Sequence, residues 1–415
     1  MKVVILIADS NSACPVPASR GGAVATLVEH IVEMNNEKNK IQLEIVSYFD
    51  EKAYELSKNY SNIEFKWIRV PPIIKILDSC IFFIMKTVFK KAKSISYRST
   101  ASLLTYIWKT SKYISCNEYD KIVIENNVLL FWIMKFHKNH IKFKGKYYFH
   151  LHNIPRVSGK CLTQIAGCNK YICVSDFVAR TITSKDSAIN IIDKSKIAIM
   201  YNCVDTKKFK NMAHDERIQQ WRNKLNISQN DFLLIFVGRI SKEKGVDHVI
   251  KALHLLKHKN VKLIIVGNTF NRGKIKSEFE EELQKLTLPV RDKVIYTGYI
   301  PQSELPILYS MANVAVLPSV WDEPAGLTMV EAMACGIPVI TTNAGGIPEY
   351  TSENCSIVLD NDNELSQNIA NCVDQLVDNP NLVDGMINNC VEHVRKNFDV
   401  ENYLEDFIDI LSSKS

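Results

Sequence analysis

The sequence predicts an α/β protein with two domains, each built on a parallel β-sheet. Its 415 residues are enough for two domains that each bury a core of their own. Short apolar runs alternate with longer amphipathic runs, which is the pattern of parallel strands joined by crossover helices. This alternation stops in a polar stretch after Asp205 and starts again at Phe232, so the two series predict two Rossmann-like domains.

The first series begins with an apolar run at the N-terminus. Val3–Ala8 is shorter than the core of a signal peptide and far shorter than a spanning helix, so we expect it to be a strand. No later apolar run approaches the length of a membrane span. The elements expected in this half are the strands Val3–Ala8, Leu43–Tyr48, Lys121–Glu125, Tyr147–His150, Lys170–Val174 and Ile197–Met200, and the helix Ala23–Met34.

The second series repeats the pattern, and its last helix is predicted to return to the first domain. We expect domains at 1–205 and 206–396, with a helix in 397–415 packing back on the first domain. The apolar spacing of Tyr403, Leu404 and Phe407 predicts that helix. The other expected elements are the strands Phe232–Val237, Lys262–Val266, Val294–Thr297, Val314–Leu317 and Val339–Thr341, and the helices Val246–His258, Ser303–Ala312 and Leu327–Cys335.

The charge differs between the halves. Residues 1–205 carry 29 Lys and Arg against 17 Asp and Glu, whereas residues 206–415 carry 22 against 28. The two halves are therefore expected to face different partners. The 11 cysteines include no Cys-x-x-Cys pair, which favours reduced thiols in a cytosolic protein. Cys161, Cys168 and Cys173 lie near two histidines, but their spacing is not that of a metal site.

The basic residues of the first half are concentrated in Lys66–Arg98, which holds eight Lys and Arg and the single acid Asp78. Between them runs an apolar and aromatic segment, Cys80–Met85. Such a segment predicts either a basic helix lying on an anionic membrane surface or a basic-rimmed helix covering the domain core. No nucleic-acid-binding motif accompanies the charge, so nucleic acid is not an expected partner.

Two carboxylates, Glu323 and Glu331, flank a loop that leads into a short helix. Gly326 precedes the helix, and Gly336 ends it where a left-handed cap is needed. The free N–H groups near Leu327 and Thr328 favour an anion such as a phosphate. The carboxylates suit sugar and ribose hydroxyls, because an ionised carboxylate accepts hydrogen bonds. The alternative is a buried helix with a solvated Glu at each end.

A second polar loop follows the first strand of the second domain. Its sequence is Phe236-Val-Gly-Arg-Ile-Ser-Lys-Glu-Lys-Gly245, in which Gly238 allows a sharp turn. Open α/β sheets bind ligands at the carboxyl ends of their strands, and Arg239 and Lys244 are expected there. They would meet a diphosphate, unless the loop is simply a basic surface loop.

The first domain offers two weaker signals. Arg20-Gly21-Gly22 leads into a helix and can form a backbone anion site, although it is not a dinucleotide fingerprint. His150 and His152 end a strand and lie on the same side of it, where a histidine can contact a sugar hydroxyl or a developing charge.

One acidic pattern is not expected to bind metal. Asp360-Asn-Asp362 has the acid-x-acid spacing used by many metal-dependent transferases, but it precedes a helix, where such residues form caps and turns.

Together these segments resemble glycosyltransferase family 4, the retaining group 1 glycosyltransferases of GT-B fold. The similarity is densest from Phe236 to Tyr350, and Asn202-Cys-Val-Asp205 resembles the family's Asn-Gly-Val-Asp linker with Cys203 in place of Gly. The resemblance implies an α/β GT-B architecture of two Rossmann-like domains facing each other across a cleft. The N-terminal domain would bind the acceptor, and the C-terminal domain would bind a nucleotide sugar.

The resemblance also implies roles for individual residues. Arg239 and Lys244 would hold the donor pyrophosphate, Glu331 the ribose hydroxyls and Glu323 the transferred sugar. His152 is the expected histidine beside the sugar, with His150 as the alternative. The remaining donor-binding positions implied by the resemblance are Gly22, Gly238, Tyr299, Gly326, Leu327 and Thr328, and no metal or other cofactor is implied.

The expected activity is transfer of a hexose or N-acetylhexosamine from a nucleotide sugar, UDP being favoured over GDP, to a lipid-linked oligosaccharide. The expected setting is bacterial surface polysaccharide synthesis, such as O-antigen, capsule or exopolysaccharide, at the cytoplasmic face of the cell membrane. The alternatives are a transferase with a small soluble acceptor, a GT-B phosphorylase or epimerase, and a non-catalytic nucleotide-sugar-binding protein.

Overall fold

The computed structural model describes residues 1–8, 14–89, 97–267 and 278–413. Its contacts divide the chain into two units. The first unit contains Met1–Tyr201 and Glu401–Ser415, and the second contains Asn202–Val400. The division falls a few residues before Asp205, the last residue of the expected N-terminal domain.

The first unit is built on a seven-stranded parallel sheet of order β3-β2-β1-β4-β5-β6-β7. Most of its inner strand residues are fully buried, which requires helices on both faces of the sheet. The strands are β1 (Lys2–Leu6), β2 (Gln42–Tyr48), β3 (Ile63–Ile68), β4 (Lys121–Glu125), β5 (Tyr147–Leu151), β6 (Tyr171–Cys173) and β7 (Ile197–Ile199).

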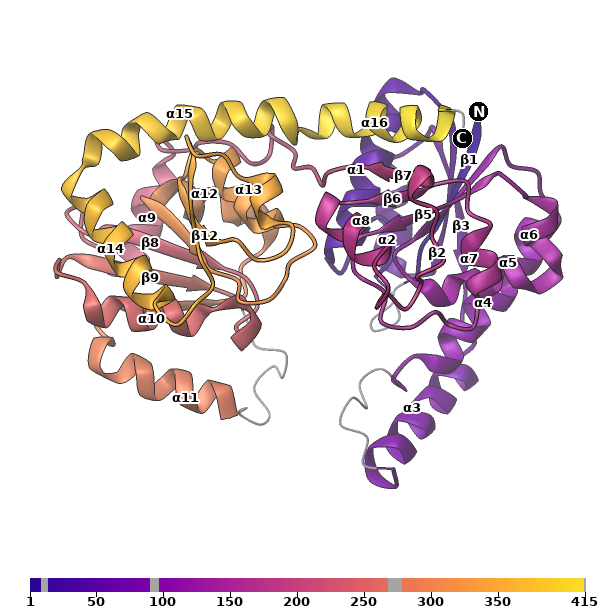
Figure 1. Cartoon of the computed structure of the whole chain (residues 1–415), viewed down its shortest axis with the longest axis horizontal. Helices are drawn as coiled ribbons and strands as arrows, with labels where there is room; N and C mark the ends of the chain where they lie inside the picture. The colour runs from indigo at the N-terminus through magenta and orange to yellow at the C-terminus, as the bar shows by residue number, and fades with distance from the viewer. Residues whose placement is uncertain (9–13, 90–96, 268–277, 414–415) are drawn as a thin grey trace. The chain divides into compact units, whose positions relative to one another are not determined.

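The helices of the first unit include the last helix of the chain, α16 (Val400–Ser412). Tyr403, Leu404, Phe407 and Leu411 of α16 are buried, and the hydroxyl of Tyr148 donates a hydrogen bond to the carbonyl of Leu411. The other helices are α1 (Ala23–Lys38), α2 (Glu51–Ser57), α3 (Pro72–Thr87), α4 (Thr100–Ser115), α5 (Phe131–Lys135), α6 (Asn139–Lys142), α7 (Leu162–Ala166) and α8 (Asp176–Ile182) (Figure 1).

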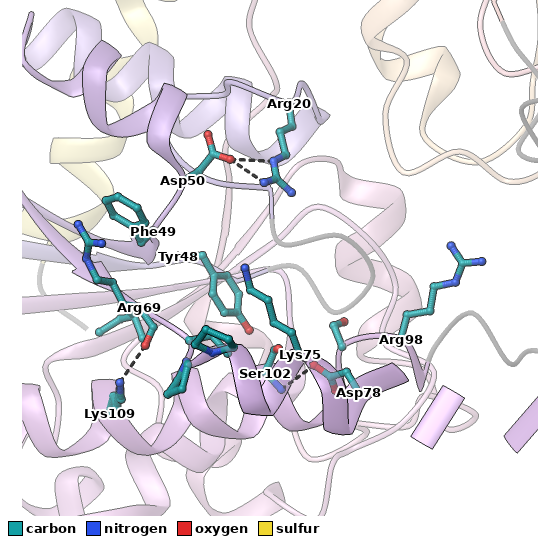
Figure 2. A pocket seen from close by; sticks show the side chains of 15 residues that line it. Arg20, Tyr48, Phe49, Asp50, Arg69, Lys75, Asp78, Arg98, Ser102 and Lys109 are labelled. Carbon is teal, nitrogen blue, oxygen red and sulfur yellow. Dashed lines mark hydrogen bonds and ion pairs between the residues drawn. The ribbon is translucent and has the colours of Figure 1, made fainter. Parts of the chain in front are cut away.

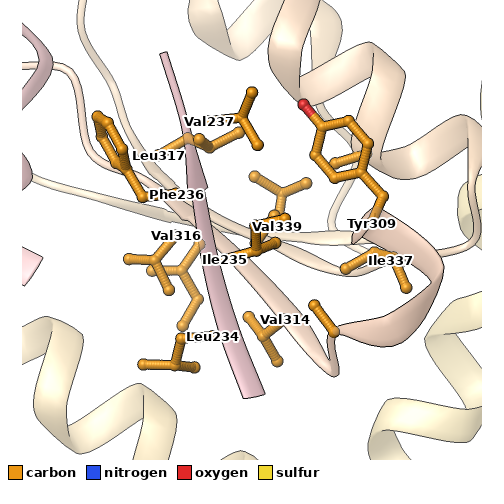
Figure 3. Packing of buried hydrophobic residues seen from close by; sticks show 14 of the residues in the cluster. Leu234, Ile235, Phe236, Val237, Tyr309, Val314, Val316, Leu317, Ile337 and Val339 are labelled. Atoms are coloured by element: carbon orange, nitrogen blue, oxygen red, sulfur yellow. The ribbon is translucent and has the colours of Figure 1, made fainter. Parts of the chain in front are cut away.

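The second unit contains a six-stranded parallel sheet of order β10-β9-β8-β11-β12-β13. Leu234, Ile235 and Val314 lie in one continuous core around the central strand β8, and Tyr309 packs at its side (Figure 3). The strands are β8 (Phe232–Val237), β9 (Val261–Val266), β10 (Val294–Gly298), β11 (Val314–Leu317), β12 (Val339–Thr342) and β13 (Ser356–Leu359). The helices are α9 (Glu216–Lys224), α10 (Val246–Leu255), α11 (Glu278–Thr287), α12 (Leu305–Met311), α13 (Leu327–Ala334), α14 (Leu365–Asp378) and α15 (Pro380–Asn397).

Two strands were not predicted, and both lie at sheet edges. β3 (Ile63–Ile68) carries charged residues on an alternating pattern and forms one edge of the first sheet. β13 (Ser356–Leu359) is four residues long and forms one edge of the second. Edge strands bury less surface than central strands, so their apolar signal is weaker.

The prediction of a single basic helix over Lys66–Arg98 was wrong in its extent. Lys66 lies in β3, and α3 covers only Pro72–Thr87. Lys90, Lys91 and Lys93 lie outside the described residues. Asp78 is the only buried residue of α3, so its apolar side chains do not cover the core of the unit.

Candidate functional site

In each sheet, the strands that follow the first strand are added on one side of it, and the later strands are added on its other side. In the second unit β8 pairs with β9 on one side and with β11 on the other, and in the first unit β1 lies between β2 and β4. Ligands of open α/β sheets bind outside the carboxyl ends of the strands at such a switch point. The predicted donor residues follow β8 and β11 or lie on the helix after them, so the chain delivers them to this edge.

The loops after β8 and β11 are bonded to each other. The N–H of Val320 and the hydroxyl of Ser319 both donate to the carbonyl of Glu243, each at 3.0 Å. Gly245 has φ +67°, and a Cβ there would lie 2.0 Å from the carbonyl oxygen of Pro318. Only glycine therefore permits the approach that brings the two loops together.

This approach brings Lys244 and Glu323 into contact. Lys244 Nζ donates to Glu323 Oε1 at 2.6 Å, and the hydroxyl oxygen of Ser319 lies 2.8 Å from the same oxygen. The two charged side chains are 27% and 15% exposed, so the pair lies at the surface of the site. An ion pair in that position can exchange partners with an incoming phosphate or hydroxyl.

The backbone of Glu323 is also fixed. The N–H of Gly346 donates to the carbonyl of Glu323 at 2.7 Å. Gly345 has φ +66°, and a Cβ there would lie 2.5 Å from that carbonyl oxygen. The loop after β12 therefore holds Glu323 in place.

The N-terminus of α13 is open, as the sequence predicts. Gly326 is its N-cap residue and gives no side-chain cap, and Leu327 and Thr328 form the start of the helix. The first N–H groups of a helix have no acceptor within it and carry partial positive charge. Gly336 follows the helix with φ +78°, which confirms the predicted left-handed cap.

Glu331 is on α13. Its carboxylate lies 3.4 Å from both the hydroxyl of Tyr309 and the amide nitrogen of Gln302. Burial raises the pKa of Glu331 to about 7, against the smaller opposite effect of those two hydrogen bonds. The Glu331 carboxyl group is therefore partly protonated at neutral pH. Hydrogen bonds donated to it by ligand hydroxyls would favour its ionised form.

The other predicted donor residues lie at exposed turns of the same sheet edge. Gly238 follows β8, and a Cβ on Gly267 after β9 would lie 1.8 Å from the Gly238 carbonyl oxygen. Arg239 is exposed, and Tyr299 after β10 is 72% exposed. These residues are accessible to a ligand at the carboxyl edge of β8, β9 and β10.

In the first unit Gly22 is the N-cap residue of α1 and has φ +112°. A Cβ on Gly22 would lie 3.1 Å from the sulfur of Cys14. Glycine is thus required at this position by its backbone conformation and favoured by the limited space.

Both predicted histidines contact a carboxylate that the sequence analysis did not single out. Glu125 ends β4 and pairs in register with His150 of β5. One Glu125 oxygen lies 3.1 Å from His150 Nδ1 and 3.0 Å from His152 Nε2. The prediction that the two histidines share a side of the strand is confirmed. The signal for Glu125 was its position at the end of the strand next to theirs.

The charge of Glu125 fixes the protons of the two rings. Burial opposes its ionisation, but the charge and hydrogen bonds of His150 and His152 outweigh this and lower the pKa of Glu125 to about 2. An ionised carboxylate only accepts hydrogen bonds, so His150 Nδ1 and His152 Nε2 each carry a proton. His150 Nε2 is buried and has no hydrogen-bond partner among the described residues.

Glu125, His150 and His152 are also the group of the described residues that could hold a metal ion, since their ligand atoms lie within 4.8 Å of one another. Their mutual distances are those of direct hydrogen bonds, and we interpret the cluster in that way.

The buried cysteines do not join this group. Cys161, Cys168 and Cys173 are free thiols, and burial raises the pKa of Cys161 to about 11.

The acid-x-acid pattern lies in a turn. Asp362 accepts a hydrogen bond from the N–H of Glu364, just before α14, and Asp360 accepts one from the side chain of Asn343. This agrees with the interpretation of the segment as a cap and turn.

Residues 217–393 match the family model described as glycosyl transferases group 1. Most of the second unit is therefore similar to group 1 glycosyl transferases. An uncharacterized glycosyltransferase of Methanocaldococcus jannaschii is 31% identical over 174 residues, which are 41% of this chain and 43% of that protein. The chain thus spans less than half the length of this curated relative.

Similarity of fold extends beyond the group 1 domain. The structure of Anabaena HepE in complex with UDP and glucose has a TM-score of 0.71, 19% identity and 99% coverage of both chains. WaaG, a glycosyltransferase involved in lipopolysaccharide biosynthesis, has a TM-score of 0.66 and 15% identity, covering 99% of this chain and 100% of WaaG. The two Rossmann-like units therefore form a GT-B glycosyltransferase fold, and the fold predicted from the sequence is confirmed.

Proposed function

We propose that the protein is a retaining, metal-independent glycosyltransferase of family 4. It moves a hexose or N-acetylhexosamine from a nucleotide sugar to a lipid-linked oligosaccharide during bacterial surface polysaccharide synthesis. The observation that carries this proposal is the contact of Lys244 with Glu323 at a switch point of the group 1 domain, beside the open N-terminus of α13.

The donor is bound through its diphosphate and its hydroxyls. Lys244, Arg239 and the first N–H groups of α13 hold the diphosphate. When the phosphate takes over Lys244, Glu323 becomes available to a hydroxyl of the transferred sugar. Glu331 accepts hydrogen bonds from the ribose, and backbone groups near Tyr299 contact the base. The complexes of HepE with UDP and with UDP-glucose support UDP as the nucleotide.

Catalysis follows from the charges that develop as the glycosidic bond breaks. Negative charge accumulates on the departing diphosphate, and fixed cations and amides around it lower the barrier. The acceptor hydroxyl attacks from the side of the leaving group, and the departing phosphate takes its proton, so the configuration is retained. His152 lies beside the sugar, with Glu125 holding its ring in orientation.

The acceptor is proposed to be lipid-linked because α3 exposes apolar side chains next to basic ones. Ile73, Ile76 and Phe83 are 71%, 64% and 64% exposed. A helix of this kind binds the anionic inner face of a cell membrane through apolar insertion and charge. No helix in the described ranges is long and apolar enough to cross a bilayer.

The function is tested by measuring the release of UDP or GDP from a panel of UDP- and GDP-sugars, with and without a lipid-linked oligosaccharide. We expect release to depend on the lipid acceptor and on one UDP-sugar. Turnover with a small soluble acceptor alone would favour the transferase of soluble substrates. Donor binding, measured by thermal stabilisation, without any transfer would favour a nucleotide-sugar-binding protein.

The membrane part is tested by sedimentation with anionic vesicles. Ile76→Ser and Phe83→Ser should reduce the bound fraction severalfold, because each removes apolar area from α3. Leu288→Ser is the matched control, since Leu288 is also 63% exposed but belongs to the second unit. Equal binding of all variants would contradict a membrane role for α3.

A further inference from the structure

The first unit contains a pocket of about 630 Å³ that none of the predicted site residues occupies. It lies at the carboxyl ends of β2 and β3, and residues of α3 and α4 also line it (Figure 2). This is the edge of a parallel sheet at which ligands bind. The pocket therefore has the position of a substrate site, next to the exposed helix α3.

The charge of the pocket is positive. Five basic residues and two acids line it, and both acids are already bonded within the protein. Asp50 forms an ion pair with Arg20 at 2.7 Å. Asp78 is buried and accepts hydrogen bonds from the N–H groups of Ala101 and Ser102 at 2.7 and 3.1 Å. Asp78 thus satisfies the N-terminus of α4, and the five basic residues still exceed the two acids by three charges.

Three of these cations, Arg69, Lys75 and Arg98, form no ion pair with any carboxylate in the described part of the chain. Two are held by aromatic rings. The guanidinium of Arg69 lies 3.5 Å from the ring centroid of Phe49, and that of Arg98 lies 4.7 Å from the ring centroid of Phe82. A guanidinium stacked in this way keeps its N–H edge available and loses little freedom when it binds an anion.

The fourth cation supports the first. Lys109 Nζ donates to the backbone carbonyl of Arg69 at 2.8 Å, which fixes the residue that carries the stacked guanidinium. Figure 2 shows Lys109 below Arg69 at one side of the pocket, and Lys75 and Asp78 at the other. Guanidinium and ammonium groups around one space select a compact polyanion, for which phosphate and diphosphate are the matching chemistry.

The apolar surface next to the pocket belongs to the same helix. Lys75 lines the pocket, whereas Ile73, Ile76 and Leu77 of α3 are exposed beside it. An anionic group in the pocket would place an attached hydrocarbon chain on these side chains. Charge and apolar area are thus adjacent, as a lipid with a phosphorylated head requires.

We propose that this pocket binds the phosphate or diphosphate group of the lipid-linked acceptor, with Arg69, Lys75 and Arg98 as its ligands. The proposal rests on the proposed function, and it names the part of the acceptor that the first unit recognises.

Binding is tested by calorimetry on the full chain with farnesyl diphosphate, pyrophosphate and farnesol, in the presence of excess UDP. UDP occupies the anion site of the second unit, so that the remaining heat reports the pocket. We expect farnesyl diphosphate to bind, pyrophosphate to bind at least tenfold more weakly and farnesol not to bind. Equal affinity for pyrophosphate and farnesyl diphosphate would overturn the lipid assignment.

The residues are tested with R69A, K75A and R98A. Each should weaken farnesyl diphosphate binding at least tenfold and raise KM for the lipid-linked acceptor, with KM for the donor unchanged. Lys112→Ala is the matched control, because Lys112 is exposed on α4 and does not line the pocket. Circular dichroism verifies that each variant is folded.

The outcomes separate the pocket from the proposed function. Transfer to a lipid-linked acceptor with unchanged KM in all three variants would overturn the pocket and leave the function. Specific binding of farnesyl diphosphate that the variants lose, in a protein without transfer, would leave the pocket and overturn the function.

Discussion

The carboxyl edges of the two sheets carry groups of opposite character. In the first unit Glu125, His150 and His152 form a buried cluster whose carboxylate is satisfied by two rings of its own protein. In the second unit Lys244 and Glu323 form a pair that is partly exposed. The first arrangement holds side chains in a fixed orientation, whereas the second can open to a ligand. Similar sheets thus carry a positioning cluster in one unit and an exchangeable binding site in the other.

Lys244→Ala removes the cation of the exchangeable site and should have the largest effect. We expect kcat/KM for transfer from the nucleotide sugar to fall about 10²- to 10³-fold, because a preorganised cation at the leaving group is lost. The double variant Lys244→Ala with Glu323→Gln tests whether part of the loss comes from an unpaired Glu323.

The control for this variant is Lys285→Ala, an exposed lysine in the last turn of α11. A loss for Lys244→Ala no greater than that of the control would place the diphosphate elsewhere.

Glu125→Gln removes the negative charge of the buried cluster. Glutamine removes the charge that both rings contact and buries an NH2 group in place of one acceptor oxygen, so the free energy of unfolding should fall by about 1–3 kcal/mol. Urea denaturation measures this change.

Glu118→Gln is the matched control, because the Glu118 side chain is 80% exposed. If Glu125→Gln and the control were equally stable, the cluster would not hold its side chains as the geometry indicates.

Donor binding by the second unit should depend on pH through Glu331. The pKa of Glu331 is about 7 in the free protein, and ribose hydroxyls that donate to its carboxylate would lower that pKa in the complex. Binding must then remove a proton below pH 7, so the affinity for a UDP-sugar should fall up to about tenfold per pH unit as the pH decreases. Above pH 7 the affinity should be constant.

Glu331→Gln should abolish this pH dependence, and Glu353→Gln, an exposed acid, should retain it. A fluorescence or calorimetric titration from pH 5.5 to 8.5, roughly one and a half units on either side of the Glu331 pKa, checks both. A profile unchanged by Glu331→Gln would remove Glu331 from the ribose site.

The smallest expected effect is that of a chelator. Because the cluster is interpreted as hydrogen-bonded, EDTA should leave the transfer rate unchanged, and elemental analysis should find no stoichiometric metal. A loss of activity that Zn²⁺ or Mn²⁺ restores would show instead that Glu125 and its two histidines bind metal.

The sequence predicted the second unit better than the first. Glycines at 238, 245 and 336 mark turns that bring strand ends and helix ends to the site, and each is visible in the sequence itself. Glu125 was missed because its role depends on β4 lying next to β5, which is a property of strand order and register.

The basic pocket was also not predictable from the sequence. The charge run around Arg69 and Lys75 suggested one helix, but a strand ends at Ile68 and a new helix begins at Pro72. The turn between them places both Arg69 and Lys75 in the lining of one pocket. A count of basic residues does not show that turn, because it does not record where one element ends and the next begins.

Because α16 belongs to the first unit, that unit is built from two segments of the chain that are separated by the whole second unit. Four large apolar side chains of α16 fill the first unit, each contributing about 1.5–3 kcal/mol of burial. A premature stop codon just after Phe398 would therefore unfold the first unit and leave the second unit folded. Expression of the N-terminal half by itself would require a circularly permuted gene that supplies this last helix in cis.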